Sequence, residues 1–178
     1  AYDQIRMSIA FPRLNVKLVG SHSGISIGED GPSQMGIEDI ALATSFPNFT
    51  VVAPADEPSM RAATRAILAH DGPVYLRSGR PRVPIVYEDD VDFQIGKANR
   101  LREGGDVTII AFGLMVAAAL EAAHALSEDG IEARVLDMHT LKPLDEDAVE
   151  EAARETGAIV TAEEHLLNGG LGSEVARA

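Results

Sequence analysis

Residues 107–136 read VTIIAFGLMVAAALEAAHALSEDGIEARVL, and this stretch decides the fold class. Its β-branched runs at 107–110 and 133–136 predict two strands. The alanine-rich segment between them, residues 114–127, predicts a helix that ends at Asp129-Gly130. A strand, a helix and a second strand in this order predict a parallel sheet with a crossover helix.

The same alternation continues on both sides of this stretch. Asp56, with Pro58 in the first turn, and Asp145 are placed to cap helices, and the second of these helices ends at Gly157. The other predicted elements are strands at 16–19, 50–53, 74–76 and 159–161 and a short helix at 36–44. The pattern predicts an α/β protein built from two consecutive three-layer α/β/α units with largely parallel sheets.

Two domains of about 90 residues each are expected from this pattern. The alternation breaks between Ser78 and Gly105, where Pro, Arg and Asp are frequent, so a linker is placed at 86–105. Both units are expected to be incomplete at the chain ends. Residues 2–7 read as a helix without an N-cap, and residues 172–176 read as a helix that has barely begun.

Composition and charge exclude several classes of protein. The 178-residue chain has no cysteine, which rules out disulfides and thiolate metal sites. Its net charge of −13 argues against nucleic acid and anionic membranes as partners. No apolar run approaches the roughly 20 residues of a membrane span, and no secretory leader follows Ala1, so a cytoplasmic location is expected.

The stretch from Gly20 to Met35 lacks a regular pattern and follows a predicted parallel strand. Ligands bind at the carboxyl ends of such strands. Glycines allow a ligand to approach the backbone, and polar side chains could bind it or transfer protons; these residues are Gly20, Gly24, Gly28 and Gly31, and His22, Glu29, Asp30 and Gln34. Composition alone favours equally a ligand-binding loop and a solvated glycine-rich loop.

The segment Arg77-Ser78-Gly79-Arg80-Pro81-Arg82 is a second candidate site at the end of a predicted strand. Guanidinium groups suit a phosphate or carboxylate through bidentate hydrogen bonds. The alternative is that they neutralise the acidic residues at 88–90.

Other polar groups are given structural roles. The glycine-rich run 168–172 is interpreted as a tight turn rather than an anion cradle, and Glu163-Glu164 as a solvated strand end. The remaining histidines show no spacing typical of a metal site; they are His70, His124, His139 and His165.

Residues 21–35, SHSGISIGEDGPSQM, followed by Ile-Glu-Asp at 37–39, closely resemble the transketolase family of thiamine enzymes. Further segments match that family in the same order, namely 52–56, 75–81, 136–145 and 163–172. The resemblance therefore covers essentially the whole chain and is more specific than any single motif.

The resemblance implies a pyrimidine-binding domain at 1–85 and a transketolase C-terminal domain at 106–178. The implied activity is transfer of a two-carbon ketol unit between sugar phosphates, in the pentose phosphate pathway. Thiamine diphosphate and Mg²⁺ (or Ca²⁺) would be bound mainly by a domain or subunit outside this sequence. The implied partners are that thiamine-diphosphate-binding domain or an N-terminal transketolase subunit, in a homodimer or heterotetramer.

Carried over residue by residue, the resemblance assigns a substrate site. Asp30 would bond a hydroxyl of the donor sugar, and His22 and Arg80 would hold its phosphate. Gln34 stands where many members have His, which puts a proton role at this position in doubt, and Arg77 is expected to be structural. The Glu that activates the cofactor in this family is expected upstream of Ala1, so no catalytic residue is assigned in this segment.

Two other functions remain open. One is a noncatalytic assembly or regulatory module that has the thiamine-enzyme fold. The other is an enzyme like 1-deoxyxylulose-5-phosphate synthase or the beta chain of a 2-oxoacid dehydrogenase. Loops of these enzymes lack the Glu29-Asp30-Gly31-Pro32 context followed by Gln34-Met35.

Overall fold

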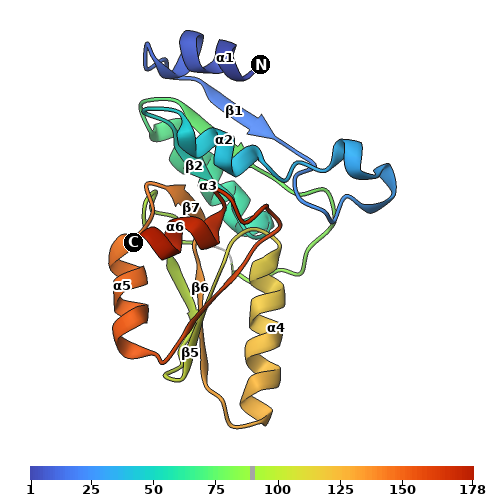
Figure 1. The fold of residues 1–178 in the computed structure, drawn as a ribbon, viewed down its shortest axis with the longest axis vertical. Coiled ribbons are helices and arrows are strands. Elements are labelled where there is room, and N and C mark those ends of the chain that lie inside the picture. Colours follow the sequence, from blue (N-terminus) through green and yellow to red (C-terminus); the bar gives the residue numbers. More distant parts are fainter. Residues whose placement is uncertain (89–90) are drawn as a thin grey trace.

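The computed structural model describes residues 1–88 and 91–178, and its strands form two sheets, each with four strands (Figure 1). The first sheet has the order β1-β3-β2-β7. Its first three strands are parallel, whereas β7 pairs antiparallel with β2. The strands are β1 (Lys17–Gly20), β3 (Val74–Arg77), β2 (Thr50–Val52) and β7 (Thr140–Lys142).

The second sheet has the order β4-β6-β5-β8 and is also mostly parallel. The central strand β5 pairs parallel with β6 and β8, and β4 runs antiparallel to β6 at the edge. The strands are β4 (Asn99–Arg102), β6 (Ala133–Asp137), β5 (Val107–Ala111) and β8 (Ile159–Ala162). The predicted α/β class with two largely parallel sheets is confirmed.

Helices cover both sheets. They are α1 (Tyr2–Ile5), which continues as a π-helical turn η1 (Arg6–Ala10), then α2 (Asp39–Ser45), α3 (Glu57–Ala69), α4 (Met115–Glu128), α5 (Glu146–Glu155) and α6 (Leu171–Arg177). Two 3₁₀ turns, η2 (Gly28–Asp30) and η3 (Pro32–Gln34), interrupt the loop between β1 and α2. The predicted caps are confirmed, because the Asp56 carboxylate accepts from the Ser59 amide at 3.0 Å and Asp145 caps α5.

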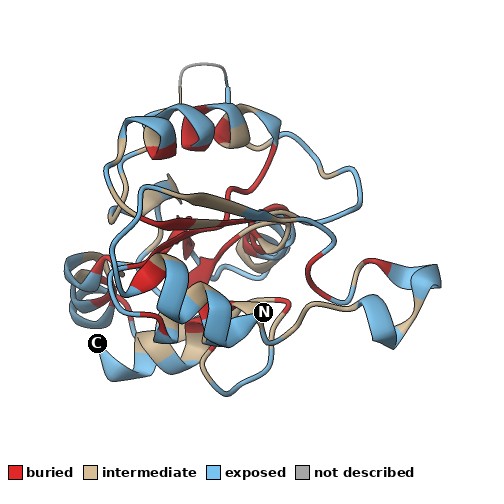
Figure 2. Ribbon diagram, turned by 90° about the horizontal axis from the view of Figure 1, so that it is seen from above, coloured by how far each residue is buried: buried red, intermediate tan, exposed pale blue. Residues whose placement is uncertain are grey.

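The side chains of adjacent strand residues pack against helices on opposite faces. In β5, Ile110 joins a cluster with Val149 of α5, whereas Ile109 packs with Val116 of α4. In the first sheet, Val52 packs against Ile67 of α3. Figure 2 shows buried residues along the strands and exposed residues on the outer helix faces.

Strand β7 joins the two halves of the chain. It follows β6 of the second sheet after two residues, yet it pairs with β2 of the first sheet. One core cluster accordingly combines Ile40 and Val51 from the first half with Leu136 and Leu171 from the second. The two α/β units are therefore not strictly consecutive, because the second half supplies a strand to the first sheet.

The interpretation of residues 86–105 as a linker was wrong for residues 99–102, which form β4. This segment, Asn-Arg-Leu-Arg, lacks the β-branched residues that predict a strand. It occupies a sheet edge, where charged side chains reach solvent and the ladder with β6 supplies the hydrogen bonds.

Candidate functional site

The loop at residues 21–35, called here the 21–35 loop, leaves the carboxyl end of β1 and projects from the molecule (Figures 1 and 2). A parallel bridge between Ser23 and Gly36 closes its neck, and the Gly24 amide donates to the Gly36 carbonyl at 2.8 Å. Beyond the neck, Gly28–Asp30 and Pro32–Gln34 are largely exposed 3₁₀ turns. The loop thus has a fixed base and a solvated tip.

Arg80 contacts this tip. Its Nη1 donates to the Ile27 carbonyl at 3.0 Å and lies 3.4 Å from Asp30 Oδ2. Its Nη2 reaches Glu29 Oε1 at 3.4 Å. The Arg80 side chain is 38% exposed, and those of Asp30 and Glu29 are 44% and 82% exposed. These pairs are weak enough to be exchanged for groups of a ligand.

His22 and Gln34 are both exposed. His22 adopts a left-handed backbone with φ +65°, and its Nδ1 lies 2.9 Å from Ser21 Oγ. Within residues 1–88 and 91–178, no side-chain hydrogen bond or ion pair reaches Gln34 or joins His22 to Arg80. The structure therefore joins Asp30 and Arg80 directly, whereas within the described residues no such contact joins His22 or Gln34 to them.

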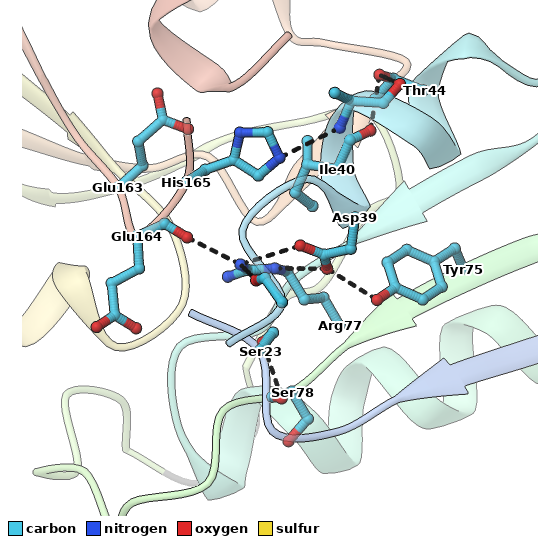
Figure 3. A network of polar contacts seen from close by, with 12 residues as sticks. Ser23, Asp39, Ile40, Thr44, Tyr75, Arg77, Ser78, Glu163, Glu164 and His165 are labelled. Carbon is cyan, nitrogen blue, oxygen red and sulfur yellow. Dashed lines mark hydrogen bonds and ion pairs between the residues drawn. The ribbon is translucent and has the colours of Figure 1, made fainter. Parts of the chain in front are cut away.

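Arg77 forms a buried network at the base of the loop (Figure 3). Its Nε and Nη2 donate to the two oxygens of Asp39 at 2.8 and 3.2 Å. Nη2 also donates to the carbonyls of Gly36 at 3.1 Å and Glu164 at 2.9 Å. Arg77 is only 6% exposed, so these bonds support the structural role expected for it.

Tyr75 completes this network, because its hydroxyl donates to Asp39 Oδ2 at 2.8 Å. Burial, reinforced by the adjacent Asp39 carboxylate, raises the pKa of Tyr75 above its ordinary value. The hydroxyl consequently stays protonated and acts as a donor. We call Arg77, Asp39, Tyr75 and the Glu164 carbonyl the Arg77 network.

The interpretation of Glu163-Glu164 as a solvated strand end was wrong. Glu164 is 8% exposed, and its carboxylate accepts from Ser26 N at 2.9 Å and from Ser26 Oγ at 3.0 Å. Glu163 accepts from the amides of Leu171 at 2.7 Å and Gly172 at 2.9 Å. The donors of Ser26, which is distant in sequence, compensate the burial of the Glu164 charge, whereas the half-buried Glu163 is bound by amides of the following turn. The available signal was two adjacent carboxylates directly after a strand that ends at the carboxyl edge of its sheet.

Glu163 also explains the glycine-rich run at 168–172. This run turns the chain into α6, and the Glu163 carboxylate accepts hydrogen bonds from the backbone amides at the start of that helix. Residues 88–90 were the alternative counterions for the arginine cluster; of these, 89 and 90 lie outside the described residues, and the described ion pairs of Arg80 are with the 21–35 loop rather than with Glu88.

A cleft of about 280 Å³ lies between the two halves, at the carboxyl ends of β2, β3 and β5. Its lining carboxylates are already engaged. Asp56 accepts from the amides of Val86 and Tyr87 and caps α3, Glu164 holds Ser26, and Glu57 pairs with Arg61 at the surface.

The described residues include no cluster of three or more His, Cys, Asp or Glu that could hold a metal ion. The lining carboxylates of the cleft are engaged as well, so the described residues present no ready donor set for a divalent cation.

The two mostly parallel sheets and the glycine-rich loop at a carboxyl edge define an α/β protein of the kind that carries ligand loops at this edge. The family model for the pyrimidine-binding domain of transketolase matches residues 1–85. The model for the transketolase C-terminal domain matches residues 96–178. The chain belongs to the transketolase family.

Curated relatives agree with this assignment. The chain is 52% identical to a 6-deoxy-6-sulfo-D-fructose transketolase subunit from Clostridium sp. (strain MSTE9), covering 98% of this chain and 54% of the relative. It is 44% identical to an apulose-4-phosphate transketolase subunit from Phocaeicola vulgatus, covering 97% and 56%. It thus spans about half the length of these relatives.

A solved structure described as a split gene transketolase, inactive beta4 tetramer, superposes with a TM-score of 0.93 at 49% identity. That match covers 99% of this chain and 56% of the other. A transketolase variant from Pichia stipitis gives a TM-score of 0.77 at 25% identity, covering 94% of this chain and 25% of the other. Within the described residues, the structure has no helix that is both long and apolar enough to cross a membrane.

Proposed function

We propose that this chain is part of a transketolase and supplies the substrate-binding loop of an enzyme that transfers a two-carbon ketol unit between sugar phosphates. The observation that carries the proposal is the exposed contact, at 3.4 Å, between Asp30 in the loop after β1 and Arg80 just after β3, two parallel strands whose carboxyl ends meet at one edge. Both groups are accessible, and both suit parts of a sugar phosphate.

Each residue has a distinct proposed role. Arg80 donates hydrogen bonds to the terminal phosphate, and the His22 imidazole donates beside it. The Asp30 carboxylate accepts a hydrogen bond from a hydroxyl of the donor sugar. Gln34 contributes an uncharged amide at the same loop tip. When the anion binds, Arg80 exchanges its weak contacts with Asp30 and Glu29 for it.

The substrate class follows from the same guanidinium. The two subunit relatives carry names with a sulfonated sugar and a sugar phosphate, both of which have an anionic group. An arginine recognises either oxyanion through parallel hydrogen bonds. We therefore propose ketoses and aldoses that carry a terminal phosphate or sulfonate as substrates.

Thiamine diphosphate, with Mg²⁺ or Ca²⁺, would be held mainly by a thiamine-diphosphate-binding domain or N-terminal subunit. When bound, this cofactor supplies the ylid that generates and stabilises the carbanion. The described residues contribute substrate contacts to that site. Because the cofactor and the substrate contacts would come from different domains or subunits, the proposed assembly is a homodimer or a heterotetramer. The proposed location is the cytoplasm.

The test is Arg80→Ala in the complete enzyme with its partner subunit, compared with Arg154→Ala. Arg154 is a matched control because it is exposed on α5 and pairs with Glu150. We expect the KM for phosphorylated sugars to rise by roughly 30- to 100-fold, from the loss of a charge-assisted pair, and the KM for unphosphorylated sugars to change less than about threefold. Equal effects on both substrates would refute the phosphate role.

A noncatalytic assembly module is the second candidate, and one comparison favours it. The solved structure with a TM-score of 0.93 is described as an inactive tetramer. Titration with thiamine diphosphate in the presence of the partner subunit separates the two functions. A cofactor-dependent spectral change and turnover of xylulose phosphate support transketolase, turnover of pyruvate supports a synthase-like enzyme, and no change at all supports the module.

A further inference from the structure

Glu164 connects the two halves of the chain at the 21–35 loop. It follows β8 in the second half, yet its carboxylate accepts from Ser26 N at 2.9 Å and Ser26 Oγ at 3.0 Å, 138 residues away in sequence. The residue is 8% exposed. Hydrogen bonds to a carboxylate that is shielded from water are stronger than those between neutral groups. Ser26 is therefore held firmly by a residue of the other sheet.

The backbone of Glu164 is itself immobilised. Arg77 Nη2 donates to the Glu164 carbonyl at 2.9 Å, and the same guanidinium is clamped by Asp39 (Figure 3). The carboxylate that holds Ser26 thus projects from a fixed main chain. Its position is set by the Arg77 network rather than by the loop that it contacts.

Gly24 provides the space for this carboxylate. It has φ +86°, and a Cβ built there would lie 2.2 Å from Glu164 Oε2 and 2.9 Å from its Cδ. Only glycine combines this backbone with so close an approach. The base of the loop is consequently shaped around the Glu164 side chain.

The contact continues toward the proposed substrate residues. Ser26 is followed by Ile27, which is 3% exposed and whose carbonyl accepts from Arg80 Nη1 at 3.0 Å. The same nitrogen lies 3.4 Å from Asp30 Oδ2. Ser26 is thus the anchored residue directly before the segment that contacts Arg80, and the exposed tip begins at Gly28.

We propose that Glu164 is a positioning residue, which fixes the base of the 21–35 loop so that Asp30 and Arg80 face a substrate together. This role rests on the proposed function of the loop tip as a sugar-phosphate site. Without the Glu164 carboxylate, the tip samples more conformations, and binding must order it first. Glu164 thereby affects substrate binding through the loop that it holds.

The experiment uses the complete protein with its partner subunit and compares Glu164→Ala, Glu164→Gln and Ser26→Ala. The side-chain amide introduced by Glu164→Gln would accept from Ser26 N and donate to Ser26 Oγ, so this variant is the conservative rescue. Glu163→Gln is the matched control, because Glu163 binds amides at the start of α6 and none in the loop.

Amide hydrogen exchange over residues 24–34 provides the first readout and needs no substrate. We expect exchange to be about tenfold faster in Glu164→Ala. In Ser26→Ala it is expected to be about threefold faster, because the hydrogen bond from the backbone N–H of residue 26 to Glu164 remains. Glu164→Gln and Glu163→Gln are expected to stay within about twofold of the wild type. Unchanged exchange in both alanine variants overturns the proposal. If Glu164→Ala does not fold, unchanged exchange in Ser26→Ala alone overturns it.

The second readout is kinetic. The KM for a phosphorylated donor is expected to rise about tenfold in Glu164→Ala and to recover in Glu164→Gln, with kcat within about threefold of the wild type. If Glu164 is purely structural, Glu164→Ala lowers the melting temperature and leaves KM and loop exchange unchanged. That result also overturns the proposal. If the wild-type enzyme transfers no ketol unit, the proposed function fails, and the exchange experiment still decides whether Glu164 holds the loop.

Discussion

The Arg77 network and the tip of the 21–35 loop are both ionic, both lie at the carboxyl edge of the first sheet, and differ in burial. In the network, Arg77 is 6% exposed, and both oxygens of Asp39 accept its hydrogen bonds, at 2.8 and 3.2 Å. At the tip, Arg80 and Asp30 are 38% and 44% exposed and meet at 3.4 Å. The comparison shows that burial separates the arginine that holds the fold from the arginine that is free to bind a ligand.

The physical reason lies in the cost of breaking each pair. When one partner of a buried pair is removed, the other charge is left without compensation in a low dielectric. An exposed pair loses little, because water replaces the partner. Two arginines that are three residues apart in sequence therefore have different roles.

The largest effect is expected for Arg77→Ala. It leaves the half-buried Asp39 carboxylate without its cation and leaves the carbonyls of Gly36 and Glu164 without their donor, so the free energy of unfolding should fall by about 3 kcal/mol. Urea denaturation measures this change, with Arg154→Ala expected within about 0.5 kcal/mol of the wild type. A loss below about 1 kcal/mol would show that burial does not distinguish the two arginines.

Among the described residues, Asp137 is a buried carboxylate without an ion pair, and it provides a further case for comparison. Asp137 is fully buried, and the Tyr87 hydroxyl donates to its Oδ2 at 2.7 Å. Burial raises the pKa of Asp137 to about 7. The folded state therefore binds its proton more tightly than the unfolded state does, and the stabilisation is lost as the pH rises through about 7.

We accordingly expect Asp137→Asn to change the pH dependence of stability. Between pH 4 and pH 7 the unfolding free energy of the wild type should fall relative to that of the variant, by up to about 1.4 kcal/mol per pH unit. Burial lowers the pKa of the nearby His139 to about 4, but this residue is present in both proteins and its contribution cancels in the difference. The free energy of unfolding is measured by urea titration at each pH. If it depends on pH in the same way in the wild type and in Asp137→Asn, the raised pKa of Asp137 is contradicted.

The smallest effect on stability is expected for Asp30→Asn. Its pair with Arg80 is exposed, so the unfolding free energy should change by no more than about 0.5 kcal/mol. The KM for the donor sugar of the complete enzyme should nevertheless rise, since an acceptor for a hydroxyl is weakened. A large loss of stability would show that Asp30 stabilises the fold, as the residues of the Arg77 network do.

Local signals were sufficient for most elements of the fold. Asp56 and Asp145 were recognised as caps because a helix start depends on residues within one turn. Strands β4 and β7 were missed because Asn99–Arg102 and Thr140–Lys142 are short segments that become strands through pairing partners elsewhere in the chain.

In the candidate site too, features with a local sequence signal were recognised, and a contact between distant residues was missed. The 21–35 loop and the Arg77-to-Arg82 cluster were recognised from residue types at the ends of predicted strands. Glu164 was misassigned as solvated, because its partner Ser26 lies in the other half of the chain.

The sequence by itself determined the α/β class, most strands and helices, the helix caps and the family resemblance, because each depends on periodicity or on a short motif. The tertiary structure decided that β7 pairs with the first sheet, that Arg77 is buried while Arg80 is exposed, and that Glu164 holds the loop. These features depend on burial and on contacts between residues far apart in sequence, which no local pattern encodes.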